Sequence, residues 1–272
     1  MSRMAKSHRH VLGASADLRT LLGLGRSELV AFVGGGGKSS LLLSLGAELC
    51  VSSSRVVMTT TTKMGTDQIP GWATVCRTDG EVAAALERGE PAFLVGDIAG
   101  EKITGVAPEL ADRLFATRTM DYLLAEADGA RGRPFKAPAP HEPVIPTGTT
   151  LVVVVAGIDA IGLPIADVAH RPERVVALTG RLPHDPVRPV DMARVLADPE
   201  GGRRGVPAGA RVVVALTKVS SGSGADAAAA VADRLEAEPS IVRVVTIDAV
   251  AGPGSDTGAP DTAAPDSRLH RR

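Results

Sequence analysis

The chain has few aromatic residues and no excess of charge of either sign. Phe, Trp and Tyr make up 2% of its 272 residues, so the core must be built from Val, Leu, Ile and Ala. The formal net charge is -1, which excludes the basic field typical of nucleic-acid-binding proteins and a polybasic membrane-binding surface. We therefore expect neither nucleic acid nor a membrane as a partner.

Cysteines and long apolar runs are scarce as well. Cys50 and Cys76 lie far apart and outside any CxxC spacing, which argues against a disulfide framework and against a structural zinc site. The longest apolar runs, such as LVVVVAG at 151–157, are too short to span a bilayer. The basic start, MSRMAKSHRH, is not followed by an apolar stretch of secretory length. Together these features predict a cytoplasmic protein.

What the chain does contain is a series of short, nearly continuous aliphatic runs. They lack the alternation of a strand with one wet face, so they predict strands buried on both faces, as in a parallel sheet. Stretches with helical spacing lie between several of them, and this pattern predicts an α/β fold with a doubly wound, mostly parallel sheet. The expected strands cover 29–33, 55–58, 92–95, 121–127, 151–156, 211–216 and 241–247, and the expected helices 39–50, 79–88, 108–116, 190–197 and 224–237.

A glycine run, VAFVGGGGKSS at 30–40, connects the first expected strand to the first expected helix. Glycine amides and a helix N-terminus favour an anion, a lysine adds a full charge for outer phosphates, and a serine hydroxyl suits Mg²⁺. The pattern G-x-x-x-x-G-K-[ST] is a variant here, because Phe32 occupies its first glycine position. The alternative is a merely flexible loop. The predicted nucleotide-binding residues are Gly34, Gly35, Gly36, Gly37, Lys38, Ser39 and Ser40.

This loop makes the predicted fold P-loop NTPase-like and suggests a division of the chain. We expect an N-terminal arm over 1–28, with a short helix at 17–24, and a P-loop α/β domain over 29–250. Residues 251–272 consist mainly of Gly, Pro and Asp with little apolar surface, and we expect this tail to be disordered.

A threonine-rich stretch, TTTTKMG at 59–65, follows the second expected strand. Doubly wound sheets bind ligands at the carboxyl ends of their strands. Thr60 and Thr61 are therefore candidates for contacts to phosphate or Mg²⁺, and Lys63 for neutralising charge. The alternative is a strand end chosen for β propensity.

Two carboxylates, Glu126 and Asp128, follow directly on an apolar strand. In P-loop enzymes an acid at the tip of a neighbouring strand holds the metal or orients the attacking water. We therefore expect Lys38, Glu126 and Asp128 to be catalytic, with Ser39 and Glu126 holding Mg²⁺. The alternative is a pair of surface acids at a turn.

Charged residues crowd the proline-rich loop that comes next. Arg131, Arg133, Lys136, His141 and Glu142 are the candidates for a substrate or switch loop that clamps an anionic ligand. Proline limits the entropy that such a loop loses when it closes. The alternative for the His-Glu pair is a solvated dipeptide.

The stretch TKVS at 217–220 stands where GTPases of this architecture carry N-K-x-D. Lys218 is thus a candidate for nucleotide binding. Ser220 replaces the aspartate that selects guanine, and a hydroxyl lacks its charge. ATP and GTP therefore both remain candidate ligands.

Four stretches of the chain resemble the selenium-dependent hydroxylase accessory protein family of the YqeC type. They are VGGGGKSSLL, TTTTKM, EKITGV followed by LAEADGARGRPFKAPAPHEPVIP, and VVVVAGIDAIGLPI with AHRPERV. The family's loop usually ends GGKTT, and Ser39 and Ser40 keep both hydroxyls. The resemblance implies a nucleotide-binding protein associated with the maturation of molybdenum hydroxylases that contain labile selenium. A molybdenum hydroxylase or its maturation factors would then be the partner.

These observations lead to one main hypothesis and two alternatives. The main one is a Mg²⁺-dependent NTPase that uses ATP or GTP during metalloenzyme maturation. The alternatives are a small-molecule phosphotransferase, whose acceptor would meet the basic residues of the 131–142 loop, and a scaffold that binds nucleotide or cofactor without turnover.

Overall fold

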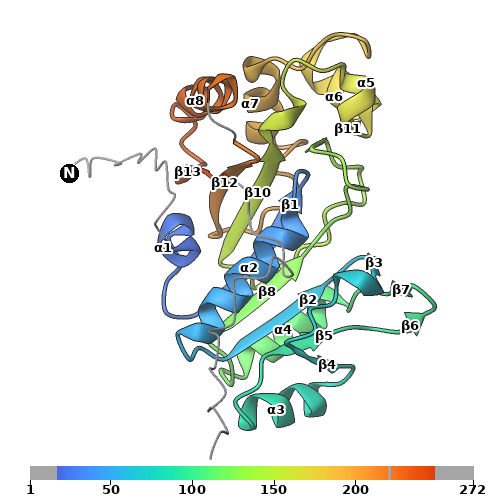
Figure 1. The fold of residues 1–272 in the computed structure, drawn as a ribbon, viewed down its shortest axis with the longest axis vertical. Helices are drawn as coiled ribbons and strands as arrows, with labels where there is room; N and C mark the ends of the chain where they lie inside the picture. Colours follow the sequence, from blue (N-terminus) through green and yellow to red (C-terminus); the bar gives the residue numbers. More distant parts are fainter. Residues whose placement is uncertain (1–16, 220–221, 249–272) are drawn as a thin grey trace, which may run out of the picture.

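The computed structural model describes residues 17–219 and 222–248 of the chain. The strands of its main sheet are β1 (Glu28–Gly34), β2 (Val56–Thr60), β4 (Thr74–Cys76), β5 (Ala92–Leu94), β8 (Tyr122–Glu126), β10 (Leu151–Gly157), β12 (Arg211–Thr217) and β13 (Arg243–Thr246). They form one parallel sheet in the order β13-β12-β10-β1-β8-β2-β5-β4 (Figure 1). The glycine-loop strand β1 therefore lies between β10 and β8.

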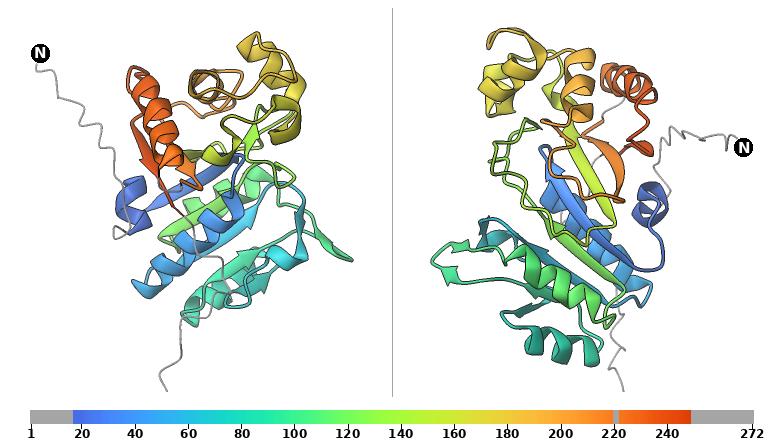
Figure 2. Two further views of the ribbon diagram at one scale, coloured as in Figure 1. Left: turned by 45° about the horizontal axis from the view of Figure 1, so that its top comes forward. Right: turned by 180° about the vertical axis from the view of Figure 1, so that it is seen from behind.

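Helices cover both faces of this sheet. They are α1 (Leu18–Leu22), α2 (Lys38–Val51), α3 (Asp79–Glu87), α4 (Pro108–Ala116), α5 (Ile165–Val168), α6 (Pro172–Thr179), α7 (Pro189–Ala197) and α8 (Ser223–Leu235), with the short 3-10 turns η1 (Thr66–Gln68) and η2 (Ile158–Ala160). Opposite views show α2 on one side of the sheet and α4 on the other (Figures 1 and 2). The α/β fold with a doubly wound, parallel sheet predicted from the sequence is confirmed.

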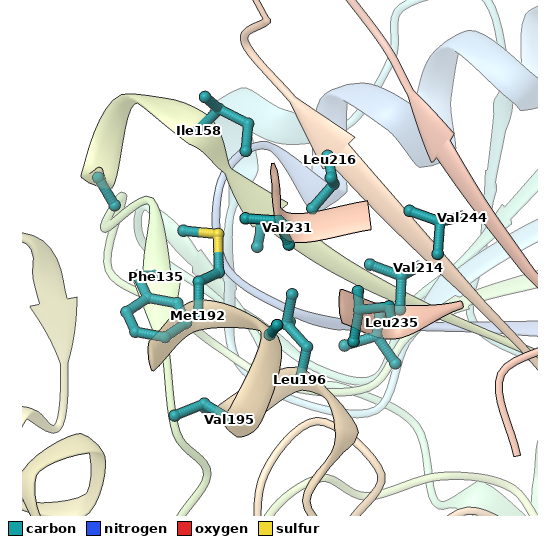
Figure 3. Close-up of a cluster of buried hydrophobic side chains, with 14 of the residues drawn as sticks. Phe135, Ile158, Met192, Val195, Leu196, Val214, Leu216, Val231, Leu235 and Val244 are labelled. Atoms are coloured by element: carbon teal, nitrogen blue, oxygen red, sulfur yellow. The ribbon is translucent and has the colours of Figure 1, made fainter. Parts of the chain in front are cut away.

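The sheet is buried on both faces, which explains the unbroken aliphatic runs. In β1, Val30 and Phe32 pack into the core under α2, whereas Ala31 and Val33 point to the opposite core. That second core includes side chains from α7 and α8, among them Leu196 and Leu235 (Figure 3). It is built from aliphatic side chains, with a single aromatic ring, that of Phe135.

Two small sheets and one edge strand were not predicted from the sequence. β3 (Met64–Gly65), β7 (Lys102–Ile103) and β6 (Ile98–Ala99) form an antiparallel unit just after the end of β2 (Figure 1). β9 (Phe135–Lys136), which lies in the proline-rich region, pairs with β11 (Ala169–His170). These strands, like β4, are two or three residues long, too short for a hydrophobic period to reveal them.

The expected division of the chain remains a prediction. The helix α1 lies within the segment 17–24, with Asp17 capping its start and Gly23 ending it in the left-handed conformation. The tail 251–272 and Ser220 lie outside the described residues. None of the helices in the described ranges has the length and apolar character needed to cross a bilayer.

Candidate functional site

The glycine loop between β1 and α2 is pressed against the end of β10. A Cβ atom on Gly34 would lie 2.3 Å from the carbonyl oxygen of Val155, and one on Gly36 would lie 2.2 Å from the nitrogen of Gly157. Both glycines also have positive φ angles, +99° and +77°. Only glycine permits this backbone approach together with this conformation. The glycine run is therefore a closely packed turn and not a merely flexible loop.

The amides of this loop divide into two groups. Those of Gly35 and Gly36 donate to the carbonyl oxygens of Val155 and Arg133, at 2.9 and 3.0 Å, and the amide of Gly34 donates to Asp128. These three amides hold the loop itself in this structure.

The N-terminus of α2 supplies the remaining amides. Its first helical bond is donated by Leu41 to Gly37 at 3.0 Å, and Gly37 caps the helix at φ +104° without a side-chain bond. The N–H groups from Gly37 to Ser40 thus have no intrahelical acceptor. Together with the partial charge of about +0.5 at a helix start, these N–H groups are of the kind that favours an anion.

Lys38 is the first residue of α2 and belongs to this helix start. Its ammonium nitrogen donates to the carbonyl oxygen of Gly34 at 2.8 Å and lies 3.3 Å from Asp128 Oδ1 and 3.7 Å from Glu126 Oε1. Its side chain is 4% exposed. A buried ammonium needs negatively charged partners. In this structure the carboxylates of Asp128 and Glu126 are those partners.

Glu126 and Ser39 form the second half of the site. Glu126 ends β8, and the hydroxyl of Ser39 donates to its Oε2 at 2.6 Å. Burial raises the pKa of Glu126, while Lys38 and the Ser39 hydroxyl act in the opposite direction. No group of three or more His, Cys, Asp or Glu residues within 17–219 and 222–248 could hold a metal. Mg²⁺ would fit here on Ser39 and Glu126 with phosphate oxygens completing its shell, as is common for this ion.

Asp128 connects the loop to a fully buried lysine. Its Oδ2 lies 2.9 Å from the ammonium nitrogen of Lys136, whose side chain is 0% exposed. The same nitrogen donates to the carbonyl oxygen of Gly129 at 2.6 Å and lies 3.0 Å from Glu142 Oε2. Lys136 is therefore fully committed to structural contacts, and a small acceptor could not reach it.

The series of ion pairs Lys38–Asp128–Lys136–Glu142 continues to Arg171 near the surface. Arg171 donates to both carboxylate oxygens of Glu142, at 3.1 and 3.2 Å. Burial alone would raise the pKa of Glu142, but the hydrogen bonds from Arg171 and Lys136 outweigh it and lower that pKa to about 2. Arg171 has φ +65° at the start of α6, a conformation that is uncommon for a non-glycine residue.

The other residues expected in the proline-rich loop stay outside this network. Arg131, Arg133 and His141 are exposed. The link from Arg133 to the phosphate loop is made by its carbonyl oxygen, which accepts from Gly36. Of the five predicted residues of this loop, the structure brings Lys136 and Glu142 to the site.

The threonine-rich stretch serves mainly to join strand ends. The hydroxyl of Thr60 donates to the carbonyl oxygen of Glu126 at 3.1 Å, and that of Thr61 to the carbonyl oxygen of Val144 at 2.7 Å. Lys63 is exposed and takes part in none of the ion pairs found in the described residues. These threonines position the acid of β8 through its backbone.

The end of β12 also reaches the loop. The hydroxyl of Thr217 donates to the carbonyl oxygen of Gly36, and Lys218 forms an ion pair with Asp159 at 2.8 Å. The predicted base-binding element thus lies beside the phosphate loop, although its last residue, Ser220, lies outside the described residues.

Sequence reasoning missed three residues of this region, Gln68, Asp159 and Arg171. Gln68 Oε1 lies 3.2 Å from the Ser39 hydroxyl, and no sequence pattern points to it. Arg171 falls in the stretch AHRPERV, where the family resemblance was the one available indication. Asp159 falls in VVVVAGIDAIGLPI in the same way.

The chain is similar in sequence to one protein family and to one protein of known sequence from Escherichia coli. The family model "YqeC protein" matches residues 30–173. The YqeC protein of Escherichia coli (strain K12) is 32% identical over 198 residues, which cover 72% of this chain and 77% of that protein. Among solved structures, the hydrogenase maturation factor HypB from Archaeoglobus fulgidus is 14% identical over 85% of each chain, with a TM-score of 0.35. FtsY from Mycoplasma mycoides is 10% identical over 82% of this chain and 52% of that one, with a TM-score of 0.32.

The family model covers the loop, both carboxylates and the proline-rich segment. On that basis, the chain belongs to the YqeC protein family.

Proposed function

We propose that this protein is a Mg²⁺-dependent NTPase. The observation that carries the proposal is the place of Lys38: a buried ammonium, 3.3 Å from Asp128 Oδ1, beside the unpaired amides at the start of α2. An ammonium, backbone amides and a helix N-terminus at one point are the elements that bind the β and γ phosphates in P-loop proteins.

Each residue has a distinct part in this proposal. Lys38 exchanges its carboxylate partners for phosphate oxygens, and the amides from Gly37 to Ser40 bind the same group. Ser39 and Glu126 would hold Mg²⁺, which neutralises charge on the transferred phosphoryl group when bound. The raised pKa of Glu126 suits a carboxylate that orients water or accepts its proton.

The network beyond Asp128 offers a route for a conformational response. When Lys38 moves to phosphate, Asp128 keeps Lys136 and the Gly34 amide as partners. The change in charge around Asp128 affects Glu142, which shares Lys136 with it, and Glu142 in turn pairs with Arg171 at the start of α6. We infer that these ion pairs couple the occupancy of the phosphate site to the surface around α6.

The biological setting in this proposal comes from the family resemblance. A protein that changes conformation with nucleotide state would assist the maturation of selenium-dependent molybdenum hydroxylases by gating contact with such an enzyme or its maturation factors. The base is not assigned, because Thr217 and Ser220 replace the residues that select guanine.

Calorimetric titration of ATP and GTP, with and without Mg²⁺, tests the proposal. We expect binding of at least one triphosphate, and a loss of about 30-fold to 100-fold in affinity for Lys38→Ala, since charge-assisted bonds to phosphate are lost. Lys102→Ala, an exposed lysine on β7, is the matched control and should bind as the wild type does. Unchanged affinity in Lys38→Ala would contradict the assignment.

Hydrolysis needs its own measurement. We expect Mg²⁺-dependent phosphate release by the wild-type protein, alone or with a molybdenum hydroxylase present, and loss of that release in Glu126→Gln. Binding without phosphate release under either condition would reject the NTPase and favour a scaffold.

A further inference from the structure

A cavity of about 720 Å³ opens beside the phosphate loop, between the outer side of α2 and the segment 67–72. It begins at Ser39, which also belongs to the phosphate site. Its size lies within the range of small-molecule sites. The lining residues are Ser39, Ser40, Leu43, Ser44, Ala47, Asp67, Gln68, Ile69, Pro70, Gly71 and Trp72.

The composition of the lining selects a class of ligand. No Lys, Arg or His lines the cavity, so it has no cation to compensate an anionic ligand. The walls further along α2 are apolar, with Leu43, Ala47 and Ile69, whereas Gln68 and Asp67 bring amide and carboxylate oxygens near the loop. A neutral ligand with an apolar body and N–H donors at one edge complements these walls.

Trp72 supplies a planar surface in this cavity. Its ring lies against α2, because a Cβ atom on Gly46 would be 3.4 Å from the Trp72 ring atom Cη2. The residue is 37% exposed and is the one tryptophan of the chain. An indole ring supported by a helix on one side and partly open to solvent is suited to stack on a flat ring.

We propose that this cavity binds an uncharged planar nitrogen heterocycle, stacked on Trp72 with its N–H donors toward Asp67 and Gln68. Its position next to Ser39 makes this molecule a regulator of the phosphate site, and that role rests on the proposed function. The binding itself does not require the nucleotide. The site differs from the basic loop 131–142, where the phosphotransferase alternative places an acceptor.

The fluorescence of Trp72 tests binding directly, because no other tryptophan contributes. The probes are indazole, purine and quinazolin-4-one as neutral heterocycles, and nicotinate as the anionic control. We expect saturable quenching by at least one neutral probe, and at least about tenfold weaker binding of the anion. The proposal is wrong if no neutral probe changes the emission, or if the anion binds equally well.

Two variants separate this site from the phosphate site. Ala47→Phe fills the cavity nine residues along α2 from Lys38, about 13 Å along the helix axis. We expect it to lose at least tenfold in heterocycle affinity and to bind nucleotide as the wild type does. Lys38→Ala should show the reverse. If no triphosphate binds the wild-type protein but a heterocycle does, the proposed function is rejected and the inference about the cavity stands.

A third variant covers the case in which Ala47→Phe does not fold. Gln68→Ala removes an exposed side chain of η1, and we expect at least a threefold loss in heterocycle affinity, measured by Trp72 fluorescence. Unchanged affinity in every folded cavity variant would overturn the proposal.

Discussion

Gly34 directs its backbone N–H at both carboxylate oxygens of Asp128, at distances of 3.1 and 3.2 Å. This contact joins the phosphate loop of β1 to the end of the adjacent strand β8. Because Lys38 and Lys136 also bind the same carboxylate, one side chain holds the loop, its lysine and a second, buried lysine together.

Asp128→Asn should therefore destabilise the nucleotide-free protein by about 3 kcal/mol, because two buried ammonium groups lose a charged partner. Asp121→Asn is the matched control. Asp121 pairs with Arg55 at the surface, where both side chains are at least 35% exposed, and such pairs contribute about 0–1 kcal/mol. Urea unfolding at pH 7 measures both values, and equal losses would contradict the role given to Asp128.

Glu126→Gln should stabilise the protein at high pH while removing its Mg²⁺ dependence. Burial raises the pKa of Glu126 above its usual 4.5, so the ionised carboxylate reduces stability. This penalty grows as the pH rises from 4.5 to the folded-state pKa and is constant above it. Relative to the wild type, we therefore expect the variant to be more stable at pH 8 than at pH 4.5. Urea unfolding at the two pH values checks the gain, and calorimetry checks that Mg²⁺ no longer tightens nucleotide binding. A variant less stable than the wild type at pH 8 would refute this reasoning.

Glu142 should make the opposite contribution. Although burial disfavours its charge, Arg171 and Lys136 lower its pKa to about 2 from the usual 4.5. A lowered pKa means that its stabilisation is present above pH 4.5 and is lost as the pH falls toward 2. We expect Glu142→Gln to be less stable than the wild type at pH 7 by about 1 kcal/mol, after allowance for solvent screening, and the two to converge near pH 2. Glu109→Gln, on an exposed position of α4, controls for the loss of one negative charge.

The glycines of the loop should differ sharply in their response to alanine. Gly36→Ala places a methyl group 2.2 Å from the nitrogen of Gly157, so we expect a loss of about 3 kcal/mol or more. Gly37→Ala meets no atom within 4 Å but keeps φ +104°, at a cost of about 1–2 kcal/mol. Gly80→Ala, in α3 and free of both problems, should be neutral or slightly stabilising. Thermal or urea unfolding of the three variants gives the order, and equal losses would contradict the packing argument.

The fold was predictable from local patterns in the chain. Runs such as 151–156 lack polar alternation because the sheet is covered on both faces, and the helices between them carry the expected apolar spacing. The strand, glycine run and helix at 28–51 likewise predict a phosphate loop, because they lie within one continuous segment.

The partners within the site were not predictable in this way. Gly34 and Asp128 are separated by 94 positions in the chain, and Lys136 appeared from sequence to be an open ligand-binding residue although its side chain is fully buried. Hydrogen bonds between strand ends depend on strand order, which sequence patterns do not specify. The cavity at Trp72 likewise depends on how the segment 67–72 folds over α2.

The order of residues by itself determined most strands of the main sheet, the longer helices and the turn of glycines, because hydrophobic period and backbone freedom act over a few neighbouring positions. Only the tertiary structure decided that β1 lies between β8 and β10, and with it which charges face one another. The reason is physical: a buried charge needs a partner within a few ångströms, and packing of distant segments supplies that partner.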